Sequence, residues 1–312
     1  MSGVGTIFWK EMADYFGSKR FLVLFIIICL TGISVAYLAG RNLEGFTHIP
    51  SQYLLLGFFI TSAGSLPSFT FFVSFFGPLI GIILGFDAIS GERSRGTISM
   101  VLSQPVFRDS LINGKFLAGI LTIAIMFVSI FLIILGLGIW AMGFVPNLEE
   151  LSRIGIYCLA SVVYVGFWLS LGILFSILFR RTSSSALTSI MMWIFFTFFI
   201  YMIANVIADQ IVPIPAVTTP EVLAKNEAIR RAIVRVSPAA LFEEIATAAL
   251  NPSVRAFGFV NPEELAGLIP TPLSLGQSLM VVWPEFVGLA ILMLICFAIS
   301  YIVFMKQEIR SL

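Results

Sequence analysis

The sequence from Gly85 to Phe116 reads GFDAISGERSRGTISMVLSQPVFRDSLINGKF, and it forms a polar island between two long apolar segments. Only 11% of the chain is charged, yet this island holds Asp87, Glu92, Arg93, Arg95, Arg108, Asp109 and Lys115. Charged side chains are costly in the hydrocarbon core of a bilayer. The island is therefore predicted to be a loop between two membrane-spanning helices.

The composition indicates an integral membrane protein. The chain has 312 residues, 59% of them hydrophobic, and a mean hydropathy of +1.03. Soluble domains contain about 45–50% apolar residues. The net charge of +1 and the lack of a dense basic face argue against nucleic acid as a partner. We expect no cleavable secretory signal, so the first apolar run is read as a retained span.

Six segments are apolar enough over about 20 residues to span a bilayer. They are residues 21–39, 69–86, 116–145, 154–179, 186–208 and 281–304. A seventh apolar run, Tyr53–Leu66, is short and is interrupted by Gly64, Ser65 and Pro67. It is predicted to be a re-entrant or interfacial piece that leads into the second span. The whole chain, residues 1–312, is predicted to form one all-α membrane domain.

The positions of the basic residues favour six spans over seven. With six, the loops on one side hold Lys10, Lys19, Arg20, Arg93, Arg95, Arg108, Lys115, Arg180, Arg181, Lys306 and Arg310. The short loops on the other side hold only Arg41 and Arg153. Lys and Arg are enriched in cytosolic loops. Both termini and the 87–115 segment are therefore predicted to be cytosolic, in a multi-pass protein of the cell membrane.

Two helical pieces are predicted outside the spans. Residues 3–17 have an apolar stripe at Val4, Phe8, Met12 and Tyr15/Phe16, with Lys10 and Asp14 paired on another side, which is typical of an interfacial helix. Residues 209–280 carry three helix starts with proline at the first helical position, at Thr219, Ser237 and Asn261. This segment is predicted to be a helical extracytoplasmic cap. It either binds a partner or gates an exit, or it merely covers the outer ends of the bundle.

The chain lacks the residues for catalysis of its own. No Gly-x4-Gly-Lys-Ser/Thr phosphate loop is present, and Gly114-Lys115-Phe116 lacks both the glycine spacing and the hydroxyl. His48 is the single histidine, and the cysteines Cys29, Cys158 and Cys296 lie in apolar segments, so neither a metal site nor a catalytic triad is predicted. The spans are expected to hold no buried ionisable residue, which disfavours an ion-coupled carrier.

The island has the features of a docking element. Ser90-Gly91 is predicted to break the incoming helix. Glu92–Leu102 is predicted to form a short helix, with Ile98, Val101 and Leu102 on one side, that ends at Pro105. Such a helix could fit a groove on a soluble subunit. The alternative is that its basic residues only hold the loop inside the cell, but this does not account for Asp87 and Glu92.

The order of residue types in the island resembles the ABC-2 family of ATP-binding-cassette export permeases. An acidic residue is followed by Ser-Gly-Glu-Arg, Gly-Thr, Leu-Ser-x-Pro, Arg and Gly-Lys. The resemblance implies an elbow helix at 3–17 and a cytosolic coupling segment at 87–115. It implies docking of a separate ATPase through Asp87, Gly91, Glu92, Arg93, Gly96, Thr97 and Arg108, with Glu92, Arg93, Gly96 and Thr97 facing the ATPase.

The resemblance also implies partners and a division of labour. Two copies of the ATPase subunit would bind ATP and Mg²⁺, and this chain would hold no cofactor of its own. A second permease, expected to be another copy, would complete the transporter within the membrane lipids. The predicted function is that of the permease subunit of an ATP-driven exporter. An alternative is a mechanical transmitter that drives an extracytoplasmic partner through the outer cap, and a channel, carrier or intramembrane enzyme is a third.

Overall fold

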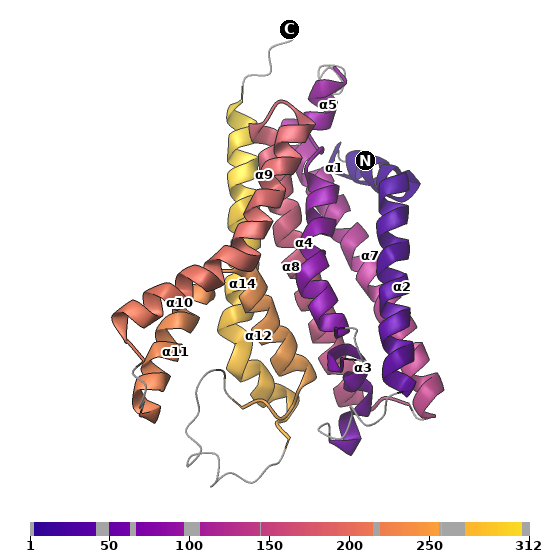
Figure 1. The fold of residues 1–312 in the computed structure, drawn as a ribbon. Helices are drawn as coiled ribbons and strands as arrows, with labels where there is room; N and C mark the ends of the chain where they lie inside the picture. The colour runs from indigo at the N-terminus through magenta and orange to yellow at the C-terminus, as the bar shows by residue number, and fades with distance from the viewer. Residues whose placement is uncertain are drawn as a thin grey trace.

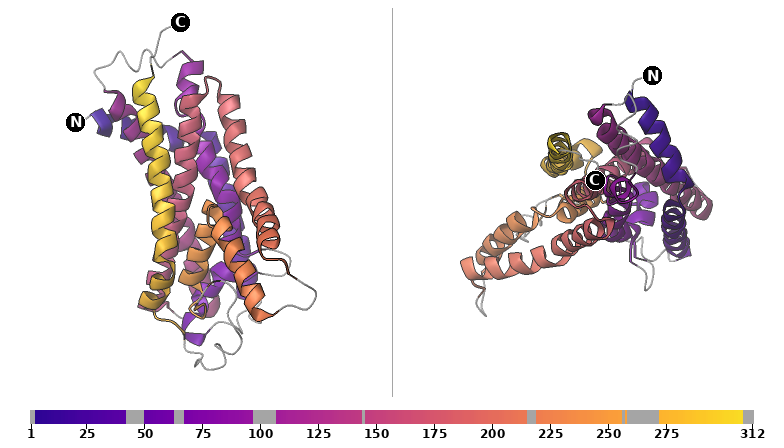
Figure 2. Two further views of the ribbon diagram at one scale, coloured as in Figure 1. Left: turned by 90° about the vertical axis from the view of Figure 1, so that its left-hand side faces the viewer. Right: turned by 90° about the horizontal axis from the view of Figure 1, so that it is seen from above.

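The computed structural model describes residues 3–41, 50–62, 67–96, 107–143, 145–214, 219–255, 257 and 272–307. Regular structure in these ranges is helical, with no strand, as the composition predicts. The helices form an elongated bundle (Figure 1). Both chain ends lie at the same end of this bundle, and α1 (Gly3–Gly17) lies across it there (Figure 2).

Five described helices are long and apolar enough to cross a membrane. They are α2 (Lys19–Arg41), α7 (Arg108–Met142), α8 (Leu148–Leu178), the continuous helix Thr182–Ile211, and α14 (Leu275–Lys306). A further apolar helix, α4 (Phe69–Gly85), has 17 residues and is shorter than these. Each of the six segments predicted to span the membrane is thus helical, and these helices extend past most of the predicted boundaries because polar turns continue them at their ends.

Glycines set the closest helix contact, between α4 and α8. Gly77, Gly81 and Gly85 recur at four-residue steps on one face of α4. A Cβ atom on Gly81 would lie 2.4 Å from the carbonyl oxygen of Val165, and one on Gly85 would lie 2.6 Å from that of Leu169. Small residues at this spacing let membrane helices approach backbone to backbone. This contact fixes α4 against the most buried helix of the bundle.

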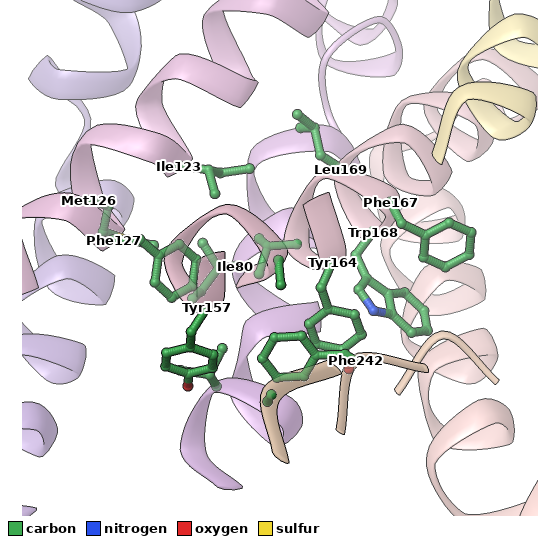
Figure 3. Close-up of a cluster of buried hydrophobic side chains, with 14 of the residues drawn as sticks. Ile80, Ile123, Met126, Phe127, Tyr157, Tyr164, Phe167, Trp168, Leu169 and Phe242 are labelled. Atoms are coloured by element: carbon green, nitrogen blue, oxygen red, sulfur yellow. The ribbon is translucent and has the colours of Figure 1, made fainter. Parts of the chain in front are cut away.

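The predicted outer cap is helical, but part of it lies inside the bundle. Its second helix, α12 (Pro238–Leu250), packs against α8 and α14, and most of its residues are buried. Phe242 stacks on Tyr164 with ring centroids 4.5 Å apart, within the aromatic core (Figure 3). The segment predicted to be an extracytoplasmic cap therefore contributes α12 to the core of the bundle. Alanines let most of α12 fit among larger helices, and its polar side chains Glu243, Glu244 and Thr247 lie on the less buried side.

The first helix of that segment forms an arm with the end of the preceding helix. Helix Thr182–Ile211 consists of α9 (Thr182–Ile194), a π-helical turn (Phe195–Phe199) and α10 (Ile200–Ile211), and α11 (Pro220–Val234) packs on α10. The arm projects sideways from the bundle (Figure 1). Pro220 begins α11 and Pro238 begins α12, as predicted. Neither Thr219 nor Ser237 caps its helix with its side chain. The Ser237 hydroxyl instead donates to the Phe196 carbonyl in the π turn, at 3.0 Å. The third predicted start, at Asn261, lies outside the described residues.

The short apolar run before the second span forms two small helices rather than a span. These are a 3₁₀ helix (Ser51–Leu56) and α3 (Gly57–Ile60). Leu55, Leu56, Phe58 and Phe59 are buried against the bundle end opposite the chain termini. The segment is thus a folded entry to α4, as its length predicts.

Candidate functional site

The polar island begins with a tight change of direction. Helix α4 ends at Gly85, residues 86–89 form a turn, and α5 (Ser90–Ser94) follows. The break therefore lies four residues before the predicted break at Ser90-Gly91, and both of those residues are helical. Gly96 has φ of +70° just after α5, a conformation that L side chains rarely adopt. The predicted helix to Leu102, Thr97 included, lies mostly outside the described residues.

Lys115 is the centre of a buried ionic triad. Its Nζ lies 2.8 Å from Oε1 of Glu11 and 2.8 Å from Oε1 of Glu92. The three side chains are 4%, 8% and 6% exposed, respectively. Burying charges is costly unless they are paired, so the triad holds α1, α5 and α7 in one arrangement. The Glu92 side chain is thus buried within this network, and its role in docking an ATPase stays a prediction.

The seat for α1 on α7 is made by a glycine. A Cβ atom on Gly114 would lie 2.7 Å from Cγ2 of Ile7, so only glycine permits this approach. The Lys10–Asp14 pair predicted on α1 is present at 2.9 Å. The inward position of Glu11 on α1 could not be predicted from the helix alone, because its role depends on Lys115, which lies 104 positions away.

A second contact ties α2 to the end of α4. Nη1 of Arg20 lies 2.6 Å from Oδ2 of Asp87, and its guanidinium lies over the ring of Phe86, 5.6 Å from the centroid. The Tyr15 hydroxyl donates to the carbonyl of Leu84, at 3.2 Å. Asp87, predicted as a docking residue, is half-buried and serves this link.

Arg93 and Arg108 connect the island to the far side of the bundle. Nη1 of Arg93 donates to the Ile177 carbonyl at the end of α8, at 2.9 Å, and Nη2 donates to Oε1 of Gln307. Nη1 of Arg108 donates to the Gln307 carbonyl, at 2.9 Å. Burial, with the nearby charge of Arg180, lowers the pKa of Arg93 below its usual range. Gln307, just after α14, thus joins both arginines to α8.

The start of α5 is held by one hydroxyl of α8. The Ser176 Oγ accepts hydrogen bonds from the backbone N–H groups of Ile89 and Ser90, both at 2.9 Å. These two N–H groups belong to the helix start, where no intrahelical partner exists. Ser176 therefore anchors α5 to the most buried helix of the bundle.

We call this set of contacts the polar platform. Its residues are Glu11, Arg20, Asp87, Glu92, Arg93, Arg108, Lys115, Ser176 and Gln307. It joins the ends of α1, α2, α4, α7, α8 and α14 around α5. Beyond it, Ser94, Arg95 and Gly96 are exposed at the tip of α5. Phe107, at the start of α7, is 80% exposed. The tip of α5 is therefore accessible to another molecule.

A second buried charge lies at the opposite end of the bundle. The Arg153 side chain is fully buried and donates to Oε1 of Glu149 at 3.0 Å, to the Ala249 carbonyl at 3.2 Å and to the Leu273 carbonyl at 2.6 Å. It also donates to Oγ of Ser278, at 3.2 Å. Arg153 thereby fastens α12 and the start of α14 to α8.

A third charge cluster, in which Glu285 is buried and Arg235 is partly exposed, links the arm to the core. Arg235 contacts Glu244 at 2.9 Å and Glu285 of α14 at 2.6 Å. On α12, Glu243 accepts a hydrogen bond from the Ser74 hydroxyl of α4, at 2.7 Å. The expectation that the predicted spans hold no buried ionisable residue is therefore wrong, because Glu285 lies in the predicted span 281–304 and is 4% exposed. Lys115 and Arg153 are buried just outside the predicted spans, because α7 and α8 begin earlier than those spans.

The described residues offer little for chemistry. No group of three or more His, Cys, Asp or Glu side chains among them is arranged to hold a metal ion. The charged side chains of the polar platform are paired with one another or with backbone groups across helices. Such pairing stabilises an arrangement of helices and is suited to transmitting movement.

Comparison with known proteins gives two findings. A family model described as "ABC-2 family transporter protein" matches residues 5–309, nearly the whole chain. A protein named "Probable ABC transporter permease protein NosY" from Pseudomonas aeruginosa is 30% identical over 205 residues, which are 63% of this chain and 67% of that protein. The protein of the same name from Stutzerimonas stutzeri is 31% identical over 127 residues, 40% of this chain and 41% of that protein.

Proposed function

Because this chain belongs to the ABC-2 family of transporter proteins and is a membrane subunit of that kind, we propose that it couples ATP hydrolysis by a separate ATPase subunit to movement across the bilayer. The ATPase binds ATP and Mg²⁺, and two copies of it act with two permease chains, expected to be identical. Substrate export is the outcome that we favour, and the substrate itself is left open.

The observation that carries the proposal is the construction of the polar platform. Helix α5 is joined through Ser90, Glu92 and Arg93 to α1, α7, α8 and the end of α14, while its tip is exposed. A force applied at the tip of α5 would therefore reach α1 and α7 through Glu92 and Lys115, and α8 and α14 through Arg93. A loop that only anchored the topology would need none of these buried contacts.

The proposal includes a topology. In this topology α4 spans the membrane in addition to the five long helices, because its 17 residues reach the lower limit for crossing a bilayer. The platform and both termini then lie in the cytosol, as the basic residues predict, and α1 lies in the interface as an elbow helix. Addition of a membrane-impermeant thiol reagent to intact cells tests this. A cysteine at Ser94 should be protected, and one at Glu221 in the arm should react.

The test of coupling separates docking from transmission. The permease is co-expressed with an ABC ATPase of its host, and the complex is purified in nanodiscs. Ser94→Trp places a bulky side chain on the exposed tip of α5 and should reduce complex formation. Glu92→Gln removes one charge of the buried triad and keeps the shape of the side chain, so it should leave the complex intact and lower its ATP hydrolysis rate several-fold. Glu221→Trp, at an 80% exposed side chain in the arm, is the matched control.

Two results would count against this proposal. If Ser94→Trp and Glu221→Trp form the complex equally well, the tip of α5 is not the docking surface. If the complex of the Glu92→Gln variant hydrolyses ATP at the wild-type rate with unchanged coupling, the triad does not transmit movement.

The arm favours a second candidate function, mechanical action on an extracytoplasmic partner. Helix α11 exposes Glu221, Lys225 and Arg230 at different points around its axis, so its surface is suited to water or to a protein rather than to lipid. The Arg235–Glu285 pair would carry movement of α14 into the arm. Lys225→Glu with Arg230→Glu should abolish binding of such a partner while ATP hydrolysis continues. Retained binding would exclude this surface of α11 as the contact.

A further inference from the structure

Two neighbouring hollows are lined in part by α2 and α4. The first is a polar cavity of about 510 Å³ at the platform end. The second is an apolar groove of about 270 Å³ between α2 and α4. Ile83 lines both, so the cavity and the groove are neighbours along α4. The function proposed above uses neither of them.

The two hollows follow the helices in the same order. On α2, Lys19, Arg20 and Phe21 line the polar cavity, and the segment 24–31 lines the groove. On α4, the groove extends from Ile83 back to Phe69, about 21 Å at the rise of an α-helix. One leaflet of the hydrocarbon core is about 15 Å thick. The groove is therefore long enough for an acyl chain that enters from the platform side.

The charges of the polar cavity favour an anion. Five basic residues line it, Lys10, Lys19, Arg20, Arg95 and Lys115, with four acidic ones, Glu11, Asp14, Asp87 and Glu92. The acids are paired: Lys115 binds Glu11 and Glu92, Lys10 binds Asp14 and Glu11, and Arg20 binds Asp87. Within the described ranges, Lys19 and Arg95 form no ion pair. Their positive charges are thus available to a ligand that sits in the cavity.

We propose that this composite hollow binds an anionic glycerophospholipid, with the phosphate in the polar cavity beside Lys19 and Arg95 and one acyl chain in the groove between α2 and α4. A cation at the interface and an adjoining apolar groove match the two halves of such a molecule. The lipid lies against Glu92, Lys115 and the Arg20–Asp87 pair, so its occupancy stabilises the arrangement of α1, α2 and α5. Binding requires no ATPase, which makes this inference independent of the coupling function.

The experiment uses the full chain in nanodiscs of equal parts phosphatidylglycerol and phosphatidylcholine. Native mass spectrometry after release measures which lipid the protein retains. Wild type should retain phosphatidylglycerol in preference. Lys19→Gln should lower that preference about five-fold, since one basic residue near a membrane surface is worth about 1 kcal/mol. Leu24→Trp should abolish it by filling the groove. Lys306→Gln and Leu294→Trp, at exposed sites away from both hollows, are the matched controls.

A second measurement needs no variant. Phosphatidylglycerol with a photoreactive acyl chain should label peptides of α2 and α4 that line the groove, in preference to peptides of α14. The proposal is overturned if wild type retains both lipids equally, if Leu24→Trp and Leu294→Trp retain phosphatidylglycerol alike, or if the label appears only on other helices.

Discussion

The buried triad leads to a quantitative prediction for Lys115→Met. The substitution keeps the length of the side chain and removes its charge, so the carboxylates of Glu11 and Glu92 lose the ammonium group 2.8 Å from each. Breaking a buried pair by removing one partner costs about 3–5 kcal/mol. We expect the lower part of that range, because Lys10 remains 2.9 Å from Glu11. A cost of about 3 kcal/mol favours detachment of α1 by roughly a hundred-fold.

Hydrogen–deuterium exchange in nanodiscs measures this effect directly, because local opening sets the exchange rate of backbone amides. Amides of α1 should exchange roughly a hundred-fold faster in Lys115→Met, while those in the middle of α8 should not change. The triple variant Glu11→Gln, Lys115→Met, Glu92→Gln removes every charge of the triad, so most of the protection should return. Unchanged exchange in α1 of the single variant, or equal loss in the triple variant, would refute the reasoning.

Three further predictions concern contacts between helices. Gly81→Ala should destabilise the bundle by about 1–3 kcal/mol in a thermal unfolding assay, because the added Cβ would lie 2.4 Å from a carbonyl of α8. In the same assay Gly136→Ala should be neutral, because its Cβ would meet nothing within 4 Å. Arg153→Met should free α12 and thereby speed up proteolysis of the arm. Arg230→Met, at a partly exposed ion pair, should change the rate of proteolysis little. Equal proteolysis rates in the two variants would contradict the proposed anchor. Ser176→Ala should raise amide exchange in α5, because it leaves two buried N–H groups without an acceptor, at a cost in stability of about 1–3 kcal/mol. An exchange rate equal to that of the wild type would show that the anchor is dispensable.

The helices of this protein could be predicted well from local signals in the sequence. Residues 3–17 form α1 with the predicted bounds, and Pro220 and Pro238 begin α11 and α12. Apolar length and capping residues act over a few positions, so they can be read from one segment at a time. The same holds for the location of the polar island.

The partners of the charged residues could not be predicted in this way. Lys115 fits the general enrichment of cations on the cytosolic side, and its burial follows only from the placement of α1 on Gly114. Arg153 was assigned to an outer loop, although it is a fully buried residue of α8. Two patterns in the sequence do indicate close helix packing rather than exposure. They are the four-residue glycine spacing on α4 and the alanines around α12.

The π turn at Phe195–Phe199 sets the helical phase between α9 and α10. A π turn accommodates one residue more than an α turn, so the side chains after it are rotated by about 100° from where an unbroken α-helix would place them. That rotation decides which face of α10 receives α11, namely the face with Ala204 and Ala208. Deleting a single phenylalanine from the turn would therefore redirect the arm, and it would displace the Phe196 carbonyl to which the Ser237 hydroxyl donates.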